Sequence, residues 1–116
     1  MTSDKTAWAV LLTEAAKADL RSTINWTADQ FGNEQAKIYA QIIYEAFSAL
    51  TEGPNAVGVK TCIEVSDKVY MLHTARSGKK ARHLIMFQIE TQTEHTIQII
   101  RILHDSMDIS RHISDQ

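Results

Sequence analysis

The fold is decided by residues 13–50, which read TEAAKADLRSTINWTADQFGNEQAKIYAQIIYEAFSAL. In the first half, a mostly apolar side chain recurs about every four residues, at Ala16, Leu20, Ile24, Thr27 and Phe31. In the second half the same spacing continues at Ala36, Tyr39, Ile42, Ile43, Ala46 and Leu50. Each series predicts an amphipathic helix with one buried face.

The ends of both helices carry recognisable signals. Thr13 can cap the first helix, and Gly32 ends it. Asn33 is the expected cap of the second helix, and Gly53 followed by Pro54 stops it. Because the turn between the two helices is so short, we expect them to lie side by side and antiparallel.

The flanking segments have the composition of strands. Residues 7–13 are an apolar run, and residues 69–74, 81–90 and 95–104 alternate or are rich in β-branched side chains. The last of these is apolar at both parities, which predicts a central strand packed on both faces. Residues 54–68 predict no element, and the chain after Asp108 is expected to be a short helix or a frayed coil. The expected fold class is α+β, in the order β-α-α-β-β-β, with a mostly antiparallel sheet. The helices would cover one face of the sheet, and its uncovered apolar face would bind a partner.

Composition limits the class of protein. A chain of 116 residues with 44% hydrophobic and 22% charged side chains is expected to be one folded domain, 1–116, rather than a disordered chain. Cys62 is the only cysteine, so no intramolecular disulfide can form. The longest apolar run is far shorter than the ~20 residues of a membrane-spanning helix. We therefore expect a cytoplasmic protein.

Charge is distributed unevenly along the chain. The net charge is −2, yet residues 68–89 contain five basic side chains and no acidic one. These are Lys68, Arg76, Lys79, Lys80 and Arg82. Such a segment suits an acidic protein or the phosphate backbone of a nucleic acid, although it is equally typical of a solvated hairpin tip.

Cofactor motifs are missing from the sequence. It contains no glycine-rich phosphate loop and no paired cysteines for zinc. His104, Asp108 and His112 have a spacing that would place them on one helical face, but His104 ends a predicted strand. We expect neither a metal nor a cofactor.

An acid–base ribonuclease is the sharpest enzyme hypothesis. His83 or His104 would transfer protons, and Arg82, Arg101 and Lys80 would stabilise the charge at phosphorus. Arg82 and His83 are consecutive, so in a strand they point to opposite faces, and Arg101 and His104 also differ in parity. This geometry argues against catalysis.

The aromatic side chains suggest both a core and an interface. We expect Trp8 and Tyr39 to pack in the core, whereas Trp26 lies off the inner stripe and is a candidate exposed anchor. Arg82, Leu84 and Met86 in the following strand would form one side of a partner groove.

Several segments resemble the ParE branch of the ParE/RelE toxin superfamily. They are LTEAAKADL at 12–20, FGNEQAKIY at 31–39, LHTAR at 72–76 with RHLIMF at 82–87, and IIRILHDSMD at 99–108. The resemblance covers residues 8–113 except 54–68. It implies the same fold, and it implies the toxin of a type II toxin–antitoxin pair.

The resemblance also implies partners. The toxin would be neutralised by a ParD-like antitoxin with a ribbon-helix-helix end and an amphipathic C-terminal segment, and it would contact operator DNA only through that antitoxin. Its target would be DNA gyrase, inhibited without catalysis. The RelE branch instead cleaves mRNA on the ribosome, which is the alternative activity. No Tyr follows Tyr70 here, which favours the ParE branch.

Two sets of contact residues follow from the resemblance and the pattern together. The antitoxin is expected to contact Trp26, Ile43, Phe47, Arg76, Lys79, Arg82 and Met86. Gyrase is expected to contact Arg101, His104, Met107 and Arg111. Relatives often carry Arg where this chain has Gln88 and Ser106, so a weakened toxin that survives as a partner-binding module is a third hypothesis.

Overall fold

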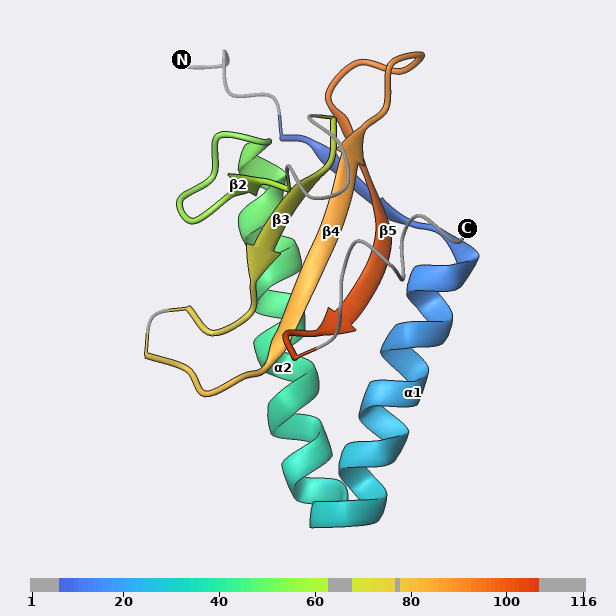
Figure 1. Cartoon of the computed structure of the whole chain (residues 1–116), viewed down its shortest axis with the longest axis vertical. Helices are drawn as coiled ribbons and strands as arrows, with labels where there is room; N and C mark the ends of the chain where they lie inside the picture. The colour runs from blue at the N-terminus through green and yellow to red at the C-terminus, as the bar shows by residue number, and fades with distance from the viewer. Residues whose placement is uncertain (1–6, 63–67, 77, 107–116) are drawn as a thin grey trace.

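A helical hairpin packs on a five-stranded sheet in this chain (Figure 1). The structure is a computed structural model and describes residues 7–62, 68–76 and 78–106. The elements are β1 (Ala9–Leu12), α1 (Glu14–Phe31), α2 (Asn33–Ala49), the 3-10 turn η1 (Leu50–Glu52), β2 (Lys60–Thr61), β3 (Tyr70–His73), β4 (His83–Ile89) and β5 (Thr96–His104). The α+β class, the helical hairpin and the predicted strands are confirmed, and β2 is an additional strand in the stretch for which no element is predicted. The short helix or coil expected after Asp108 lies outside the described residues.

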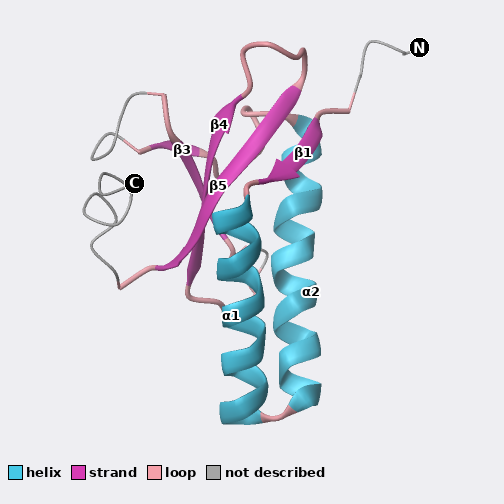
Figure 2. Ribbon diagram, turned by 90° about the vertical axis from the view of Figure 1, so that its right-hand side faces the viewer, coloured by secondary structure: helices cyan, strands magenta, loops and turns pink. Residues whose placement is uncertain are grey.

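The sheet has the order β1-β5-β4-β3-β2. β1 runs parallel to β5, and all other neighbours are antiparallel, so the expected mostly antiparallel sheet is confirmed. Both helices lie on one face of the sheet (Figure 2). They continue past its end, so the turn between them projects beyond the strands (Figures 1 and 2).

The main core lies between the hairpin and the sheet. Ala16 and Ala46 from the helices meet Phe87, Ile97 and Ile99 from the two central strands, and all five side chains are buried. Small alanines let the helices approach the sheet closely, while each large strand residue contributes about 1.5–3 kcal/mol by leaving water. β5 is packed on both faces as predicted, because Ile100 contacts a second cluster.

The second face of the sheet corrects one expectation. It was expected to be an uncovered apolar surface, yet Cys62, Val69, Leu84 and Met86 form a second buried cluster there. Cys62 and Val69 lie on either side of the connection between β2 and β3, and the Cys62 backbone N–H donates to the Val69 carbonyl at 2.7 Å. These four side chains are therefore not exposed on this face of the sheet.

The helix ends follow local chemistry with one exception. Thr13 caps α1 as predicted, since its hydroxyl oxygen accepts a hydrogen bond from the Ala16 N–H at 3.1 Å. Gly32 ends α1 with a φ of +94°, a conformation that favours glycine. The predicted cap of α2 is wrong: Asn33 is already the first helical residue, and Gly32 occupies the cap position without a side chain to bond.

Candidate functional site

A groove of about 600 Å³ lies between the helical hairpin and the β3–β4 connection. It is lined by Trp26, Thr27, Phe31, Gln35, Ile38, Tyr39 and Ile42 from the helices, by Gly78, Lys79, Lys80 and Arg82 from the connection, and by His83 and His104 from the strands. We refer to it as the groove. Residues far apart in the sequence line the groove, so no single segment of the chain predicts it.

The helical side of the groove is apolar and open to water. Trp26 is 58% exposed, Phe31 65% and Ile38 49%. The Trp26 and Phe31 rings pack edge to face with centroids 5.8 Å apart. The prediction that Trp26 is exposed is confirmed, but Phe31 was expected on the buried stripe. Phe31 is exposed because α1 extends beyond the sheet, so its last turn has no strand to pack against. A cluster of exposed aromatic side chains is typical of an interface.

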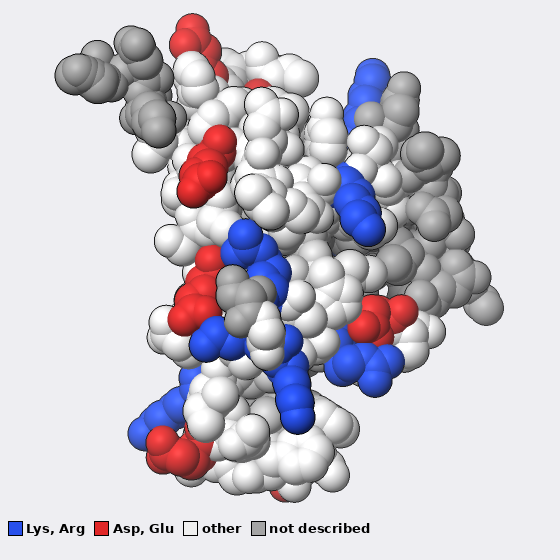
Figure 3. Space-filling view, turned by 90° about the vertical axis from the view of Figure 1, so that its left-hand side faces the viewer, with Lys and Arg blue, Asp and Glu red and all other residues white. Residues whose placement is uncertain are grey.

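The opposite side of the groove is basic. Lys79, Lys80 and Arg82 line it, and no carboxylate is among the lining residues that the structure describes. Figure 3 shows Lys and Arg side chains gathered over the middle of the face that carries the β3–β4 connection. The basic segment predicted from the sequence thus faces an apolar surface, rather than ending in a solvated tip alone.

Tyr39 joins α2 to the sheet at the floor of the groove. Its Oη lies 2.6 Å from His83 Nδ1 and accepts a hydrogen bond from the Arg82 backbone N–H at 3.0 Å. The His83 Nε2 lies 3.5 Å from Thr23 Oγ1 on α1. Tyr39 is therefore a half-buried polar bridge, rather than the core side chain that was expected, while Trp8 does pack against the main core.

Burial keeps His83 neutral. Desolvation, followed by the neighbouring His104, lowers the pKa of His83 from 6.5 to about 4. Burial also raises the pKa of the Tyr39 hydroxyl, so this group remains protonated. The floor of the groove is thus an uncharged hydrogen-bonded unit at neutral pH.

Asp105 fixes the position of Arg82 on the basic side of the groove. Its carboxylate accepts hydrogen bonds from the Arg82 guanidinium, at 2.9–3.1 Å, and from His73 Nε2 at 2.9 Å. The Arg82 and His73 hydrogen bonds lower the pKa of Asp105 to about 2. Arg82 is consequently oriented beside the groove, while much of its side chain stays exposed to a partner.

Arg101 is bound to α1 instead of facing a target. Its guanidinium donates to Asp19 at 2.7 and 3.0 Å, and its side chain is only 18% exposed. The predicted contact between Arg101 and a target is thus unsupported in this conformation, because its donors are engaged by the Asp19 carboxylate.

Of the other residues predicted to contact a partner, some line the groove and some are buried. Trp26, Lys79, Arg82 and His104 meet in the groove. Ile43 and Met86 are completely buried, so neither offers a surface to an antitoxin, and this part of the prediction is wrong. The helical and strand patterns could not reveal this because each residue lies on an apolar face, and only tertiary packing decides what covers that face.

The remaining predicted residues lie outside the groove or outside the described chain. Arg76 donates to the Val57 carbonyl at 3.4 Å, and Phe47 is half-buried against the main core. Met107 and Arg111 lie outside the described residues. Gln35 and Ile38 were missed as groove residues, and Phe31 was expected on the buried stripe. Helical spacing could not group them, because Phe31 ends α1 while Gln35 and Ile38 lie on α2 beyond the turn at Gly32.

The sequence analysis argued that alternation along a strand keeps Arg82 apart from His83, and Arg101 apart from His104, and this argument is also wrong. Arg82 and His83 both line the groove, because Arg82 precedes β4 and is not constrained by its pleat. Arg101 and His104 both line a smaller hollow of about 160 Å³ beside α1, together with His83. This hollow lies along the edge of β5 beyond Ile99, where β1 no longer pairs, so residues 101–104 line it whichever face of the sheet they belong to.

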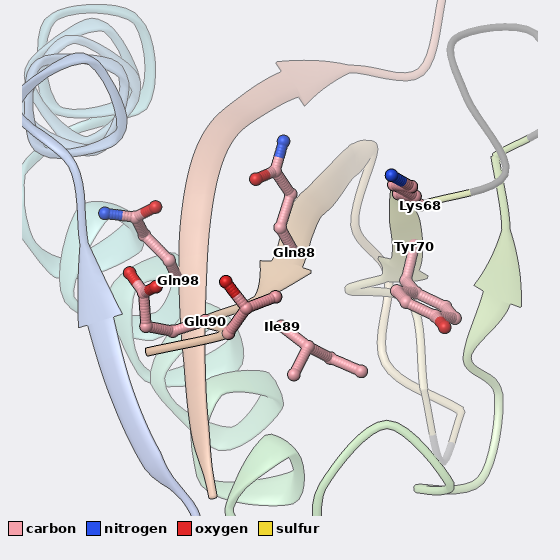
Figure 4. A pocket seen from close by; sticks show the side chains of 7 residues that line it. Lys68, Tyr70, Gln88, Ile89, Glu90 and Gln98 are labelled. Carbon is pink, nitrogen blue, oxygen red and sulfur yellow. The ribbon is translucent and has the colours of Figure 1, made fainter. Parts of the chain in front are cut away.

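A second hollow of about 460 Å³ lies near the other end of β4 (Figure 4). Its lining includes Gln88 and Gln98, which are paired across β4 and β5, and one charge of each sign, Lys68 and Glu90. The labelled side chains do not converge on a common point in Figure 4. This hollow is less suited to one ligand than the groove, where charge and apolar surface are separated.

No metal centre is present among the residues that the structure describes, since no three His, Cys, Asp or Glu side chains there form a suitable group. Of the trio that was considered and rejected from the sequence, Asp108 and His112 lie outside the described residues. None of the helices in the described part of the chain is long and apolar enough to cross a membrane.

Comparison with known proteins gives consistent results. The family described as "ParE toxin of type II toxin-antitoxin system, parDE" matches residues 10–109. Toxin ParE1 of Mycobacterium tuberculosis is 27% identical over 103 residues, which are 89% of this chain and 95% of that protein.

Solved structures share the fold. A chain of the chromosomal ParDE system from P. aeruginosa superposes with a TM-score of 0.67 at 21% identity, covering 85% of this chain and 97% of that one. A chain of the toxin–antitoxin complex RelBE2 from Mycobacterium tuberculosis gives a TM-score of 0.57 at 17% identity, covering 84% and 98%.

Proposed function

Because the chain belongs to the ParE toxin family of type II toxin–antitoxin systems, we propose that it inhibits DNA gyrase and is neutralised by a ParD-like antitoxin seated in the groove. The observation that carries the antitoxin proposal is the groove itself, where exposed Trp26 and Phe31 face Lys79, Lys80 and Arg82. An amphipathic helix with an apolar face and acidic flanks matches both sides at once.

The energetics favour such a complex. A disordered segment that folds on binding loses about 2–5 kcal/mol to ordering. Burial of apolar surface returns about 2.5 kcal/mol per 100 Å². A few hundred square ångströms over Trp26, Phe31 and Ile38 therefore offset the ordering cost, and the cations then select an acidic partner over a neutral one.

The antitoxin proposal is tested with the polypeptide encoded by the adjacent reading frame. We expect Trp26→Ala to weaken its binding at least tenfold, because an exposed aromatic anchor is lost. Tyr44→Ala is the matched control, since Tyr44 is also a large exposed aromatic residue of the hairpin, 49% exposed on α2, and does not line the groove. Equal affinities of the two variants would contradict docking in the groove.

The gyrase proposal rests on membership of the family and on the absence of a Tyr after Tyr70. We propose that inhibition requires no catalysis by this chain. Purified protein is added to gyrase and relaxed plasmid, and we expect supercoiling to fall and cleaved DNA to accumulate at micromolar toxin. Normal supercoiling, combined with cleavage of mRNA in a cell-free translation reaction, would replace this proposal with the RelE-type activity.

A further inference from the structure

His83 and His104 form the wall between the groove and the smaller hollow beside α1, and both line each of them. Their rings pack edge to face with centroids 5.3 Å apart. Two imidazole rings in contact with each other can bind a proton, and this pair lies beside the position where a partner would dock in the groove.

The surroundings of the pair differ between the two rings. The Ser106 backbone N–H donates to His104 Nδ1 at 3.2 Å. His83 contacts Tyr39 from α2 and Thr23 from α1, and its desolvation disfavours a charge. The neighbouring His104 also lowers the pKa of His83, because two protonated rings in contact would repel each other.

Negative charge near the pair is already engaged. Asp105, at 3.7 Å from His104 Nδ1, is bound by Arg82 and His73, and Asp19 on α1 is bound by Arg101. The charged or titratable neighbours that shift the pKa of His83 are His104, Asp105, His73 and Asp19. Lys79 and Lys80 add positive charge along the same groove. A carboxylate of a docked partner would therefore be the first acidic group beside the two rings that is not already paired with an Arg or His side chain of this chain.

We infer that an acidic partner docking in the groove draws a proton onto the His83–His104 pair, so that the complex tightens as the pH falls. This inference rests on the proposed antitoxin site and adds a proton to its binding reaction. A carboxylate within about 4–6 Å favours the charged imidazole. Since linkage is reciprocal, a partner that promotes protonation is itself bound more tightly when protons are abundant.

Calorimetry with the same antitoxin tests the inference. At pH 6.5, binding enthalpies are compared in PIPES and imidazole buffers, whose ionisation enthalpies differ, to count the protons taken up. We expect an uptake of up to about one proton and an affinity about 3–10-fold higher at pH 5.5 than at pH 7.5. His104→Gln, alone and with His83→Gln, should abolish most of the uptake.

A matched variant and a folding check complete the experiment. His95→Gln should leave the uptake unchanged, because His95 packs on Trp8 at 5.0 Å and does not line the groove. If circular dichroism shows that His83→Gln has lost helical structure, the result for His104→Gln alone tests the inference. Tight binding without proton uptake, or uptake that survives His104→Gln, would overturn this inference but leave the antitoxin site intact. Absence of binding at every pH would overturn both.

Discussion

Asp19 on α1 binds both the side chain of Arg101 and the backbone N–H of Ile102, the latter at 2.9 Å. β1 pairs with β5 only from Thr96 to Ile99, so the edge of β5 beyond that point lacks a neighbouring strand. One carboxylate therefore takes the place of a strand there, and it neutralises an arginine at the same time.

Removal of the Asp19 carboxylate should destabilise the protein. We expect Asp19→Ala to lower the free energy of unfolding by about 3 kcal/mol, because Arg101 would remain largely buried without its counter-charge. Chemical denaturation measures the change. Asp29→Ala on the exposed side of α1 is the control and should cost less than about 1 kcal/mol. Similar losses in both variants would contradict the role of Asp19.

Gly53 should tolerate no side chain. It has a φ of +94°, and an added Cβ would lie 2.6 Å from Trp8 Nε1. We expect Gly53→Ala to lower the free energy of unfolding by about 2–4 kcal/mol through combined strain and overpacking. Gly32→Ala is the control, because Gly32 has the same φ and nothing within 4 Å of a Cβ. It should cost only about 1–2 kcal/mol, from backbone strain without overpacking, and thermal unfolding of both variants provides the comparison.

The Tyr39 hydroxyl should contribute measurably to stability. Tyr39→Phe removes the partner of both the Arg82 N–H and His83 Nδ1, and we expect a loss of about 1–3 kcal/mol. Tyr44→Phe, at an exposed position on the same helix, should change stability by less than about 0.5 kcal/mol. If the two variants unfold at the same denaturant concentration, the hydrogen-bonded floor of the groove is not a stabilising unit.

Acid should destabilise the fold through His83. In the folded chain its pKa is about 4, against 6.5 for the ordinary group. Between these values the unfolded chain binds more protons, so the free energy of unfolding should fall as the pH drops from 6.5 to 4. The fall should be roughly 1–2 kcal/mol, since water partly screens the ring.

The contribution of His83 can be separated from that of Asp105. His83→Gln should flatten the stability curve between pH 6.5 and pH 4. The pKa of Asp105 is lowered to about 2, so the stability that it contributes is lost only below about pH 4. A slope between pH 6.5 and pH 4 that persists in His83→Gln would contradict the assignment to this histidine.

The local elements were predictable because their causes are local. The helical spacing from Ala16 to Leu50, the Thr13 cap and the Gly32 turn each depend on neighbours within a few residues. The two-faced packing of β5 was likewise visible from its isoleucines at both parities. The cap assigned to Asn33 failed because the shift of one residue at a helix end depends on the turn geometry.

The helical hairpin, every strand except β2, the basic segment and the exposed Trp26 could be predicted from the order of residues, because periodicity and charge patterns lie along the chain. Long-range packing was needed to bring Phe31 and Ile38 together with Lys79 and Lys80 in one groove, and to bury Ile43 and Met86. The physical reason is that exposure and charge pairing depend on what packs across from a residue. That neighbour is supplied by segments distant in sequence.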